Sequence, residues 1–289
     1  MNGLLEIFSY HFMVNAFRAG TIVALAAAMI GWFAVLRRES FAAHTLAVAS
    51  VPGAAGATLL GTSATGGGML FCAIAALAIA AFPRGQSARG FSEEPAVIGV
   101  VQALALASGF LFVSLYHGLL TGTNALLFGN VLGIADTQVL VLVVVAIGAL
   151  AALGAIARPL LFVSIDPLVA AAHGVRVRLL STLFLLLLGL AAAEASQIVG
   201  ALLVFALLVL PAATAQRLTA RPLTGLALSA ALGLAATWLG LLLAYYTPYP
   251  ASFYITTLAF AAFAATRWSR GVPPWRRHAS TSQACEEVA

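Results

Sequence analysis

The sequence predicts an all-α protein, a polytopic bundle of transmembrane helices. Of its 289 residues, 62% are hydrophobic and only 8% are charged, whereas about a quarter of the residues in ordinary soluble domains carry a charge. Apolar runs of about 20 residues recur along the chain, and such runs are typical of membrane-spanning helices rather than of a β-barrel. These two observations establish the expected fold class.

Nine apolar segments are candidate spans, and the count becomes eight or ten if one segment is merged or split. The third, sixth and ninth are short for a span. In chain order the segments are Phe12–Leu36, Phe41–Gly61, Gly67–Phe82, Pro95–Leu115, Thr137–Ala157, Leu179–Ala193, Ile198–Ala215, Leu223–Tyr245 and Phe253–Thr266. We expect residues 1–270 to form one transmembrane domain and residues 271–289 to form a polar cytoplasmic tail.

The positions of the basic residues predict the orientation. All 14 basic residues are arginine. With nine spans, every one except Arg18 falls on the same side: Arg37, Arg38, Arg84, Arg89, Arg158, Arg176, Arg178, Arg217, Arg221, Arg267, Arg270, Arg276 and Arg277. By the positive-inside rule this side is cytoplasmic. The N-terminus is then expected outside and the C-terminus inside.

Composition also excludes several classes of protein. The chain has no lysine, which excludes a P-loop ATPase and lysine Schiff-base chemistry. The formal charge of +5 follows from the membrane topology and does not indicate nucleic-acid binding. Cys72 lies in an apolar segment and Cys285 in the tail, so no disulfide is expected. No basic residue precedes Arg18, which argues against a cleavable signal peptide.

The run DPLVAAAHGV, residues 166–175, predicts a short helix between two spans. Asp166 is a good N-cap, because its carboxylate accepts hydrogen bonds from free N–H groups of the first turn. Pro167 then occupies the first helical position, where its missing N–H costs nothing. Gly174 lies where helices commonly end in the left-handed conformation. Such a short helix is marginal in water, so we expect it to dock on another surface at the cytoplasmic side.

This run, together with QIVGALLVFALLVLPAATAQRLT further along, resembles the membrane permease subunit of metal-ion ABC importers of the zinc, manganese and iron-chelate class. In that family an Asp-x-x-x-Ala-x-x-x-Gly segment forms a cytoplasmic loop, matched here by Asp166, Ala170 and Gly174. A later motif lines the transport core, and its matching residues are Gly200, Leu202, Leu203, Leu207, Leu208, Pro211, Ala212 and Ala215. Weaker similarity extends the resemblance from Arg37 to Arg221.

The resemblance implies an ABC type II importer-like permease in a bacterial inner membrane, working as a homodimer with two cytoplasmic ATP-binding subunits. A periplasmic or lipid-anchored binding protein would deliver a divalent metal, zinc first, with manganese or iron as alternatives. The permease would hold no permanent cofactor and would catalyse no reaction, since ATP is used by the partner subunit. Residues 166–175 would form the coupling helix, with Asp166, Pro167, Ala170 and Gly174 fixing its shape.

One departure from the family concerns the metal. Family members commonly carry Gly-Asp-Ala-Leu-x-His in the second span, whose Asp and His are candidate ligands. Aligning on Pro52 and Gly53 puts His44 at the Asp position and Val48 at the His position. A single imidazole therefore replaces the pair, and imidazole suits zinc better than manganese. His44 equally fits a histidine at the inner interface that donates a hydrogen bond to a carbonyl.

Other polar residues in or near the spans are further candidates, because ionisable groups in a membrane are costly. Glu194 and Gln197 lie at an outer turn, where they would attract or bind a cation. His117, Asn124 and Asp136 share the outer side and would receive metal there. Each of these residues also fits an ordinary solvated turn or loop. Gly200 is expected to permit close helix packing, and Pro211 to kink its span.

Three other functions compete with a metal permease. A permease for a metal chelate or another small solute would have the same fold. An ion-driven secondary transporter commonly shows internal repeats and acidic residues at mid-membrane, and neither is evident in this sequence. An intramembrane enzyme needs a histidine and carboxylate cluster at one depth, which the sequence does not indicate.

Overall fold

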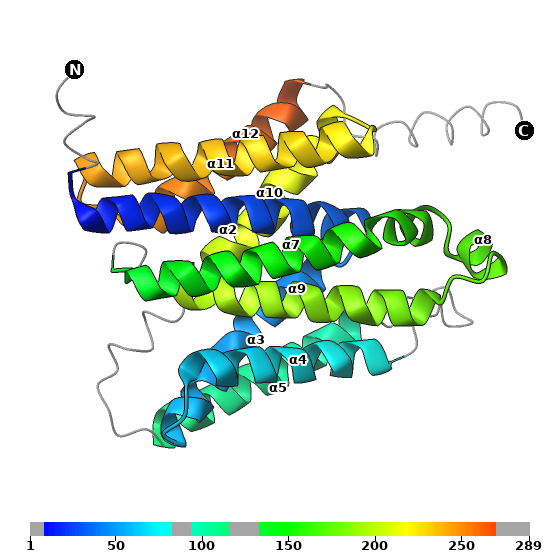
Figure 1. Cartoon of the computed structure of the whole chain (residues 1–289), viewed down its shortest axis with the longest axis horizontal. Coiled ribbons are helices and arrows are strands. Elements are labelled where there is room, and N and C mark those ends of the chain that lie inside the picture. The colour runs from blue at the N-terminus through cyan, green and yellow to red at the C-terminus, as the bar shows by residue number, and fades with distance from the viewer. Residues whose placement is uncertain (1–8, 83–93, 116–132, 270–289) are drawn as a thin grey trace, which may run out of the picture.

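The structure is a computed structural model that describes residues 9–82, 94–115 and 133–269. In these ranges every regular element is a helix (Figure 1). The helices are α2 (His11–Leu36), α3 (Ser40–Leu59), α4 (Ala64–Ala81), α5 (Glu94–Leu115), α7 (Asp136–Ile165), α8 (Pro167–Ala172), α9 (Val177–Val199), α10 (Ala201–Leu218), α11 (Pro222–Tyr246) and α12 (Ala251–Ser269). The prediction of an all-α bundle is confirmed.

Each of the nine predicted apolar segments corresponds to a long helix. Seven of these helices are long and apolar enough to cross a membrane, namely α2, α4, α5, α7, α9, α10 and α11. Helices α3 and α12 fall outside that set, and the sequence of α3 includes Ser40, His44, Thr45 and Ser50. The count of nine crossings therefore stays a prediction, although the helices themselves are present.

Helix α7 extends well beyond its predicted end at Ala157. It continues through Pro159 to Ile165, even though an internal proline removes one backbone hydrogen bond. Leu160 is fully buried and Val163 nearly so, so packing of this last part of the helix against the bundle offsets the lost bond. Arg158 consequently lies within a helix rather than in a loop.

The long helices lie side by side along the length of the molecule (Figure 1). Helix α2 packs against α10, α11 and α7, while α3 packs against α4, α5 and α9. Small residues allow the closest crossings. A Cβ atom on Gly31 of α2 would overlap the backbone carbonyl of Leu208 on α10, and one on Gly53 of α3 would overlap the carbonyl of Gly67 on α4. Backbones approach closely at such positions because no side chain intervenes.

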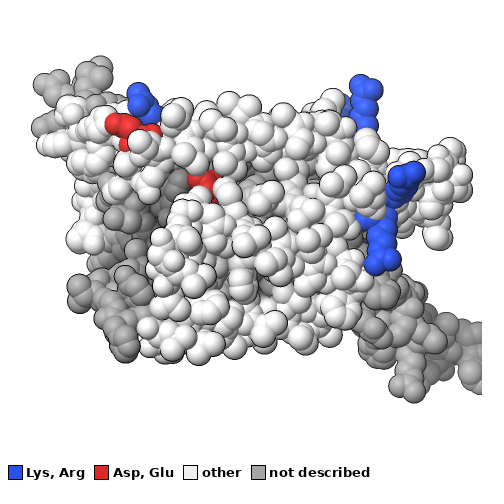
Figure 2. Space-filling view, turned by 60° about the horizontal axis from the view of Figure 1, so that its bottom comes forward, with Lys and Arg blue, Asp and Glu red and all other residues white. Residues whose placement is uncertain are grey.

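The arginines gather at one end of the bundle. Most of the arginines in the described ranges lie at or near the ends of α2, α7, α10 and α12 or at the starts of α9 and α11. They are Arg37, Arg38, Arg158, Arg176, Arg178, Arg217, Arg221 and Arg267. Arg18, in the first half of α2, lies away from them. Figure 2 shows basic side chains mainly toward one end of the visible face, whereas the acidic ones lie toward the other end and the middle, with some basic surface beside them.

Candidate functional site

The short helix α8 projects at the arginine-rich end, between α7 and α9 (Figure 1). Asp166 Oδ1 accepts hydrogen bonds from the backbone N–H groups of Leu168 and Val169, both at 3.0 Å. Pro167 is the first residue of the helix. The predicted start of this helix is therefore confirmed, and its physical cause is the Asp166 cap.

The predicted end of α8 is confirmed as well. Gly174 has a φ of +82°, which is the left-handed conformation that glycine adopts without steric cost. The N–H of Gly174 bonds to the carbonyl of Ala171 at 2.9 Å, and the N–H of Val175 to that of Ala170 at 3.1 Å. These two bonds form a Schellman motif, which satisfies carbonyls left free at the end of the helix.

Helix α8 buries little of its own apolar surface. Ala170 is fully buried, whereas Leu168 is 82% exposed and Val169 is also exposed. The Nδ1 atom of His173 lies 2.9 Å from the carbonyl oxygen of Val169, so this histidine is engaged at the end of its own helix. A rigid, capped helix thus presents two apolar side chains away from the bundle.

His44 lies in the second turn of α3 and faces α10. Its ring contacts Phe205, with 4.6 Å between the ring centroids. The Nδ1 atom is buried and has no hydrogen-bond partner among the described residues. Val48, one helical turn further along α3, is buried. Val48, an apolar and buried side chain, therefore occupies the position at which family members commonly carry the histidine of the Asp–His pair.

Glu194 lies in the last third of α9 and is only 4% exposed. Its Oε2 atom has no hydrogen-bond partner within the described residues. The carboxylate borders an apolar cavity between α2, α7, α9 and α10, whose walls include Ile22, Leu142 and Val204. The expectation of a solvated turn carboxylate at this position is wrong, because α9 continues to Val199 and encloses the side chain.

The structure does not bring His44 and Glu194 together. Helices α3 and α9 both start at the arginine-rich end, and His44 is near the start of α3 whereas Glu194 is near the end of α9. With a rise of about 1.5 Å per residue, the two side chains lie at different depths. Within the described ranges, no group of three or more His, Cys, Asp or Glu side chains could hold a metal ion.

Asp136 lies at the opposite end of the bundle, at the start of α7, and belongs to a polar cluster there. Its Oδ1 atom accepts a hydrogen bond from Asn15 Nδ2 at 2.9 Å, and its Oδ2 atom lies 3.0 Å from Nε2 of His11. Asn15 Nδ2 also donates to the carbonyl of Ile134 at 3.2 Å. The buried Asn15 side chain thus holds the exposed carboxylate in one orientation.

Sequence reasoning missed this cluster. His11 and Asp136 are 125 positions apart, and no local pattern links them. Of the other predicted outer-side residues, His117 and Asn124 lie outside the described residues. Gln197 lies in α9, but its side chain lies outside what the structure describes.

Gly200 and Pro211 lie in the region of the second motif. Gly200 has a φ of +91° and separates α9 from α10, so it allows a turn that other residues adopt only with strain. Its predicted part in helix packing stays a prediction. Pro211 is buried inside α10, and its predicted kink of that span stays a prediction.

Comparison with known proteins now identifies the family. Residues 9–269, which are nearly all of the chain, match the ABC 3 transport family. The chain belongs to this family. ABC 3 proteins are transport permeases, so the described helices form a translocation subunit rather than an enzyme. The sequence-based resemblance to ABC permeases is confirmed at this level.

Individual relatives of this ABC 3 protein are similar over most of their length. The chain is 32% identical over 236 residues to the manganese import system permease protein ScaB of Streptococcus gordonii, covering 82% of this chain and 83% of that protein. It is 33% identical over 260 residues to the chelated iron transport system membrane protein YfeC of Yersinia pestis, covering 90% and 87%.

A solved structure supports the same assignment. The chain resembles PsaBC from Streptococcus pneumoniae, solved in complex with a Fab, with a TM-score of 0.81 and 28% identity, covering 96% of this chain and 98% of the other. The described ABC 3 helices therefore share the fold of an ABC permease along almost the whole chain.

Proposed function

We propose that this chain is the permease subunit of an ABC importer that carries a divalent transition metal across a bacterial inner membrane. The observation that carries the proposal is α8, because it is a capped helix too short to serve as a span and is exposed at the arginine-rich end. The names of ScaB and YfeC, which refer to manganese import and chelated iron transport, support a metal as the cargo.

Helix α8 is the element that would receive work from a separate ATP-binding subunit. Its caps hold it as a rigid body, and its exposed Leu168 and Val169 offer apolar surface to a groove on that partner. The arginine-rich end is then cytoplasmic, following the positive-inside rule. The N-terminus lies outside, and the cytoplasmic tail of residues 271–289 follows α12.

Two copies of the permease would form the pathway, and a binding protein outside the membrane would deliver the metal. The close contact of Gly31 with Leu208 is made within one chain. The second copy would therefore pack against other surfaces of the permease. At the outer end, Asp136 is the described residue best suited to attract a cation. His11 and Asn15 contact its carboxylate, and the charge of Arg18 also acts on it. His117 and Asn124 remain candidates for the same role.

The metal proposed first is zinc, and the chemistry of one residue supports it. His44 offers a nitrogen ligand, and the neighbouring Val48 offers none, whereas harder manganese prefers carboxylate oxygens. Two His44 side chains related by a two-fold axis would give a pair of imidazoles in place of one Asp–His pair per chain. Glu194 and Gln197 are further candidate ligands, of which Glu194 would have to leave its apolar cavity to meet a metal.

A chelated metal is the second candidate cargo, because YfeC is 33% identical to this chain. One experiment separates the two. The permease, reconstituted in proteoliposomes with its ATP-binding subunit and binding protein, is supplied with radioactive zinc or manganese, free or in a chelate. We expect ATP-dependent uptake of free zinc in excess of manganese. Uptake only of the chelate favours the second candidate, and uptake without ATP contradicts the proposal of an ABC importer.

A further inference from the structure

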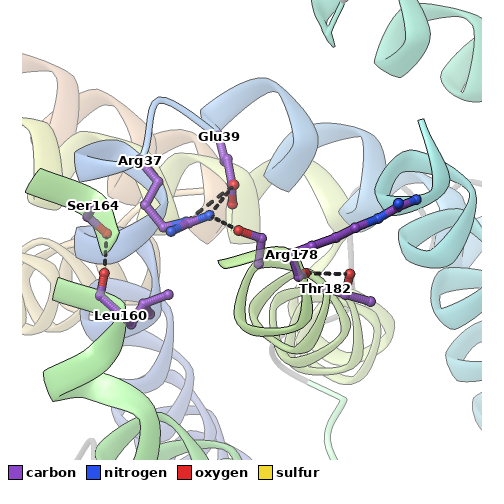
Figure 3. A network of polar contacts seen from close by, with 7 residues as sticks. Arg37, Glu39, Leu160, Ser164, Arg178 and Thr182 are labelled. Carbon is purple, nitrogen blue, oxygen red and sulfur yellow. Dashed lines mark hydrogen bonds and ion pairs between the residues drawn. The ribbon is translucent and has the colours of Figure 1, made fainter. Parts of the chain in front are cut away.

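A buried polar network lies at the arginine-rich end, between the turn that joins α2 to α3 and the first turns of α9. The Nε and Nη2 atoms of Arg37 donate to Oε1 of Glu39 at 3.2 and 3.0 Å (Figure 3). Nη2 of Arg37 also donates to Oγ of Ser181 at 2.7 Å. The Arg37 and Glu39 side chains are only 8% and 4% exposed. We call these three residues the Arg37 network.

The surroundings of the Arg37 network hold its charges in place. The guanidinium carbon of Arg37 lies 5.5 Å from the centroid of the Phe184 ring, and Phe184 is fully buried. Such a contact attracts a cation to the face of the ring. Partners that satisfy hydrogen bonds stabilise a buried charged pair, and Ser181 supplies one of these from α9.

The turn that carries Arg37 and Glu39 has a fixed shape. Arg38 has a φ of +61°, a conformation that residues with side chains adopt at an energetic cost. The N–H of Glu39 bonds to the carbonyl of Ala34 at 2.8 Å, and that of Arg38 to Val35 at 3.1 Å, which completes a Schellman motif. The end of α2 and the start of α3 are therefore one stiff unit.

A second arginine strengthens the attachment of α9. Nη2 of Arg178 donates to the carbonyl of Ala81 at the end of α4 at 3.2 Å. Together, Arg37 and Arg178 fasten the start of α9 to α2, α3 and α4. Helix α9 begins at Val177, just after Gly174 and Val175 end α8, so these attachments lie within one or two turns of α8.

Helix α7, on the other side of α8, is attached differently. Its described side-chain hydrogen bonds to another helix are at the far end, where Asp136 meets Asn15 and His11. At the end near α8, Ser164 bonds only to the carbonyl of Leu160 in the same helix among the contacts drawn in Figure 3. On the α7 side, α8 is held by packing, because the centroid of the Phe162 ring lies 5.8 Å from that of the His173 ring. The described polar attachments that link this region to other helices lie on the α9 side.

We propose that the Arg37 network transmits the movement of α8 to α3, the helix that carries His44. Arg37, Glu39 and Ser181 are positioning residues, which act through α3 and do not touch the cargo. This inference rests on the proposed function of α8 as the helix that receives work from an ATP-binding subunit. Through the network, α8, the start of α9 and the inner end of α3 move together.

The first test measures metal uptake per ATP hydrolysed by the reconstituted complex, with radioactive zinc as the probe. Ser181→Ala removes the hydrogen bond from Arg37 to α9 and leaves the Arg37–Glu39 pair. Thr182→Ala is the matched control, because Thr182 Oγ1 bonds to the carbonyl of Arg178 in its own helix at 2.9 Å. We expect Ser181→Ala to lower uptake per ATP by about fivefold or more, with Thr182→Ala close to the unsubstituted protein.

A second measurement reports the movement itself. Spin labels at Ala172→Cys on α8 and Phe41→Cys on α3, both exposed positions, are introduced with Cys285→Ser. Their distance in the complex is measured with and without ATP. We expect it to stay constant with Ser181 present and to change on ATP binding when Ser181→Ala is added.

These outcomes separate the two proposals. If the unsubstituted complex takes up metal only with ATP, and Ser181→Ala has the same uptake per ATP and the same constant distance, the network does not transmit movement, although the importer assignment stands. A label distance that changes with ATP in the unsubstituted complex also overturns the inference. If the unsubstituted complex shows no ATP-driven uptake, it is the proposed function that fails.

Discussion

Asp166 Oδ1 and the backbone N–H of Val169 are 3.0 Å apart, and this contact fixes where α8 begins. The same oxygen accepts a bond from Leu168. One carboxylate thus satisfies two of the donors that every helix leaves free at its start. A six-residue helix has few other bonds to hold it, so its shape depends on this cap and on Gly174.

Replacing Asp166 by Ala is expected to destabilise α8 by about 0.5–2 kcal/mol and to uncouple the permease from its motor. Uptake per ATP should fall by about fivefold or more, while the amount of protein in the membrane stays the same. The matched control is Asp166→Ser, which keeps an oxygen that can cap the helix. Full uptake by the Ala variant would mean that α8 does not receive work from the ATP-binding subunit.

Replacing His44 by Ala is expected to lower zinc uptake per permease molecule by about tenfold or more, as loss of a metal contact commonly does. His44→Asp together with Val48→His restores the residues common in the family and should shift preference from zinc towards manganese, because a carboxylate is a harder ligand. Uptake of both metals is measured in proteoliposomes. An unchanged rate of zinc uptake in the His44→Ala variant would mean that His44 only packs against Phe205 and does not bind the metal.

Replacing Asp136 by Asn is expected to raise the zinc concentration that gives half-maximal uptake by only about two- to fivefold, because interactions between exposed charges are weak. The maximal rate should change little, since Asp136 is far from the inner end of the bundle. The control is His11→Gln, which tests whether the histidine adds to the effect. Equal half-saturation in all three proteins would remove Asp136 from the uptake path.

Replacing Gly31 by Ala is expected to destabilise the bundle by about 1–3 kcal/mol, the usual cost of overpacking a core, because the new methyl group would overlap the carbonyl of Leu208. Gly148→Ala is the matched control, since a Cβ atom there meets nothing within 4 Å, and alanine favours the helix over glycine. Thermal unfolding in detergent measures both. A similar midpoint of thermal unfolding for the two variants would mean that α2 and α10 move apart at little cost to make room for the methyl group.

Local chemistry was enough to predict several elements. The apolar segments became helices because their backbone groups need internal partners in lipid. Asp166, Pro167 and Gly174 each favour a particular place at the start or end of a helix, so the bounds of α8 could be predicted from neighbouring residues. The end of α7 could not, because Pro159 indicates a stop, and only the burial of Leu160 explains why the helix continues.

The sequence by itself determined an all-helical membrane protein of the ABC permease type, with one capped helix among arginines, because composition, caps and motifs act over short stretches of chain. Only the tertiary structure decided that Glu194 borders an apolar cavity, that His44 meets Phe205, that His11 meets Asp136, and that Arg37 reaches Ser181. Each of these contacts joins residues that are far apart in the sequence, and their distances depend on how whole helices pack.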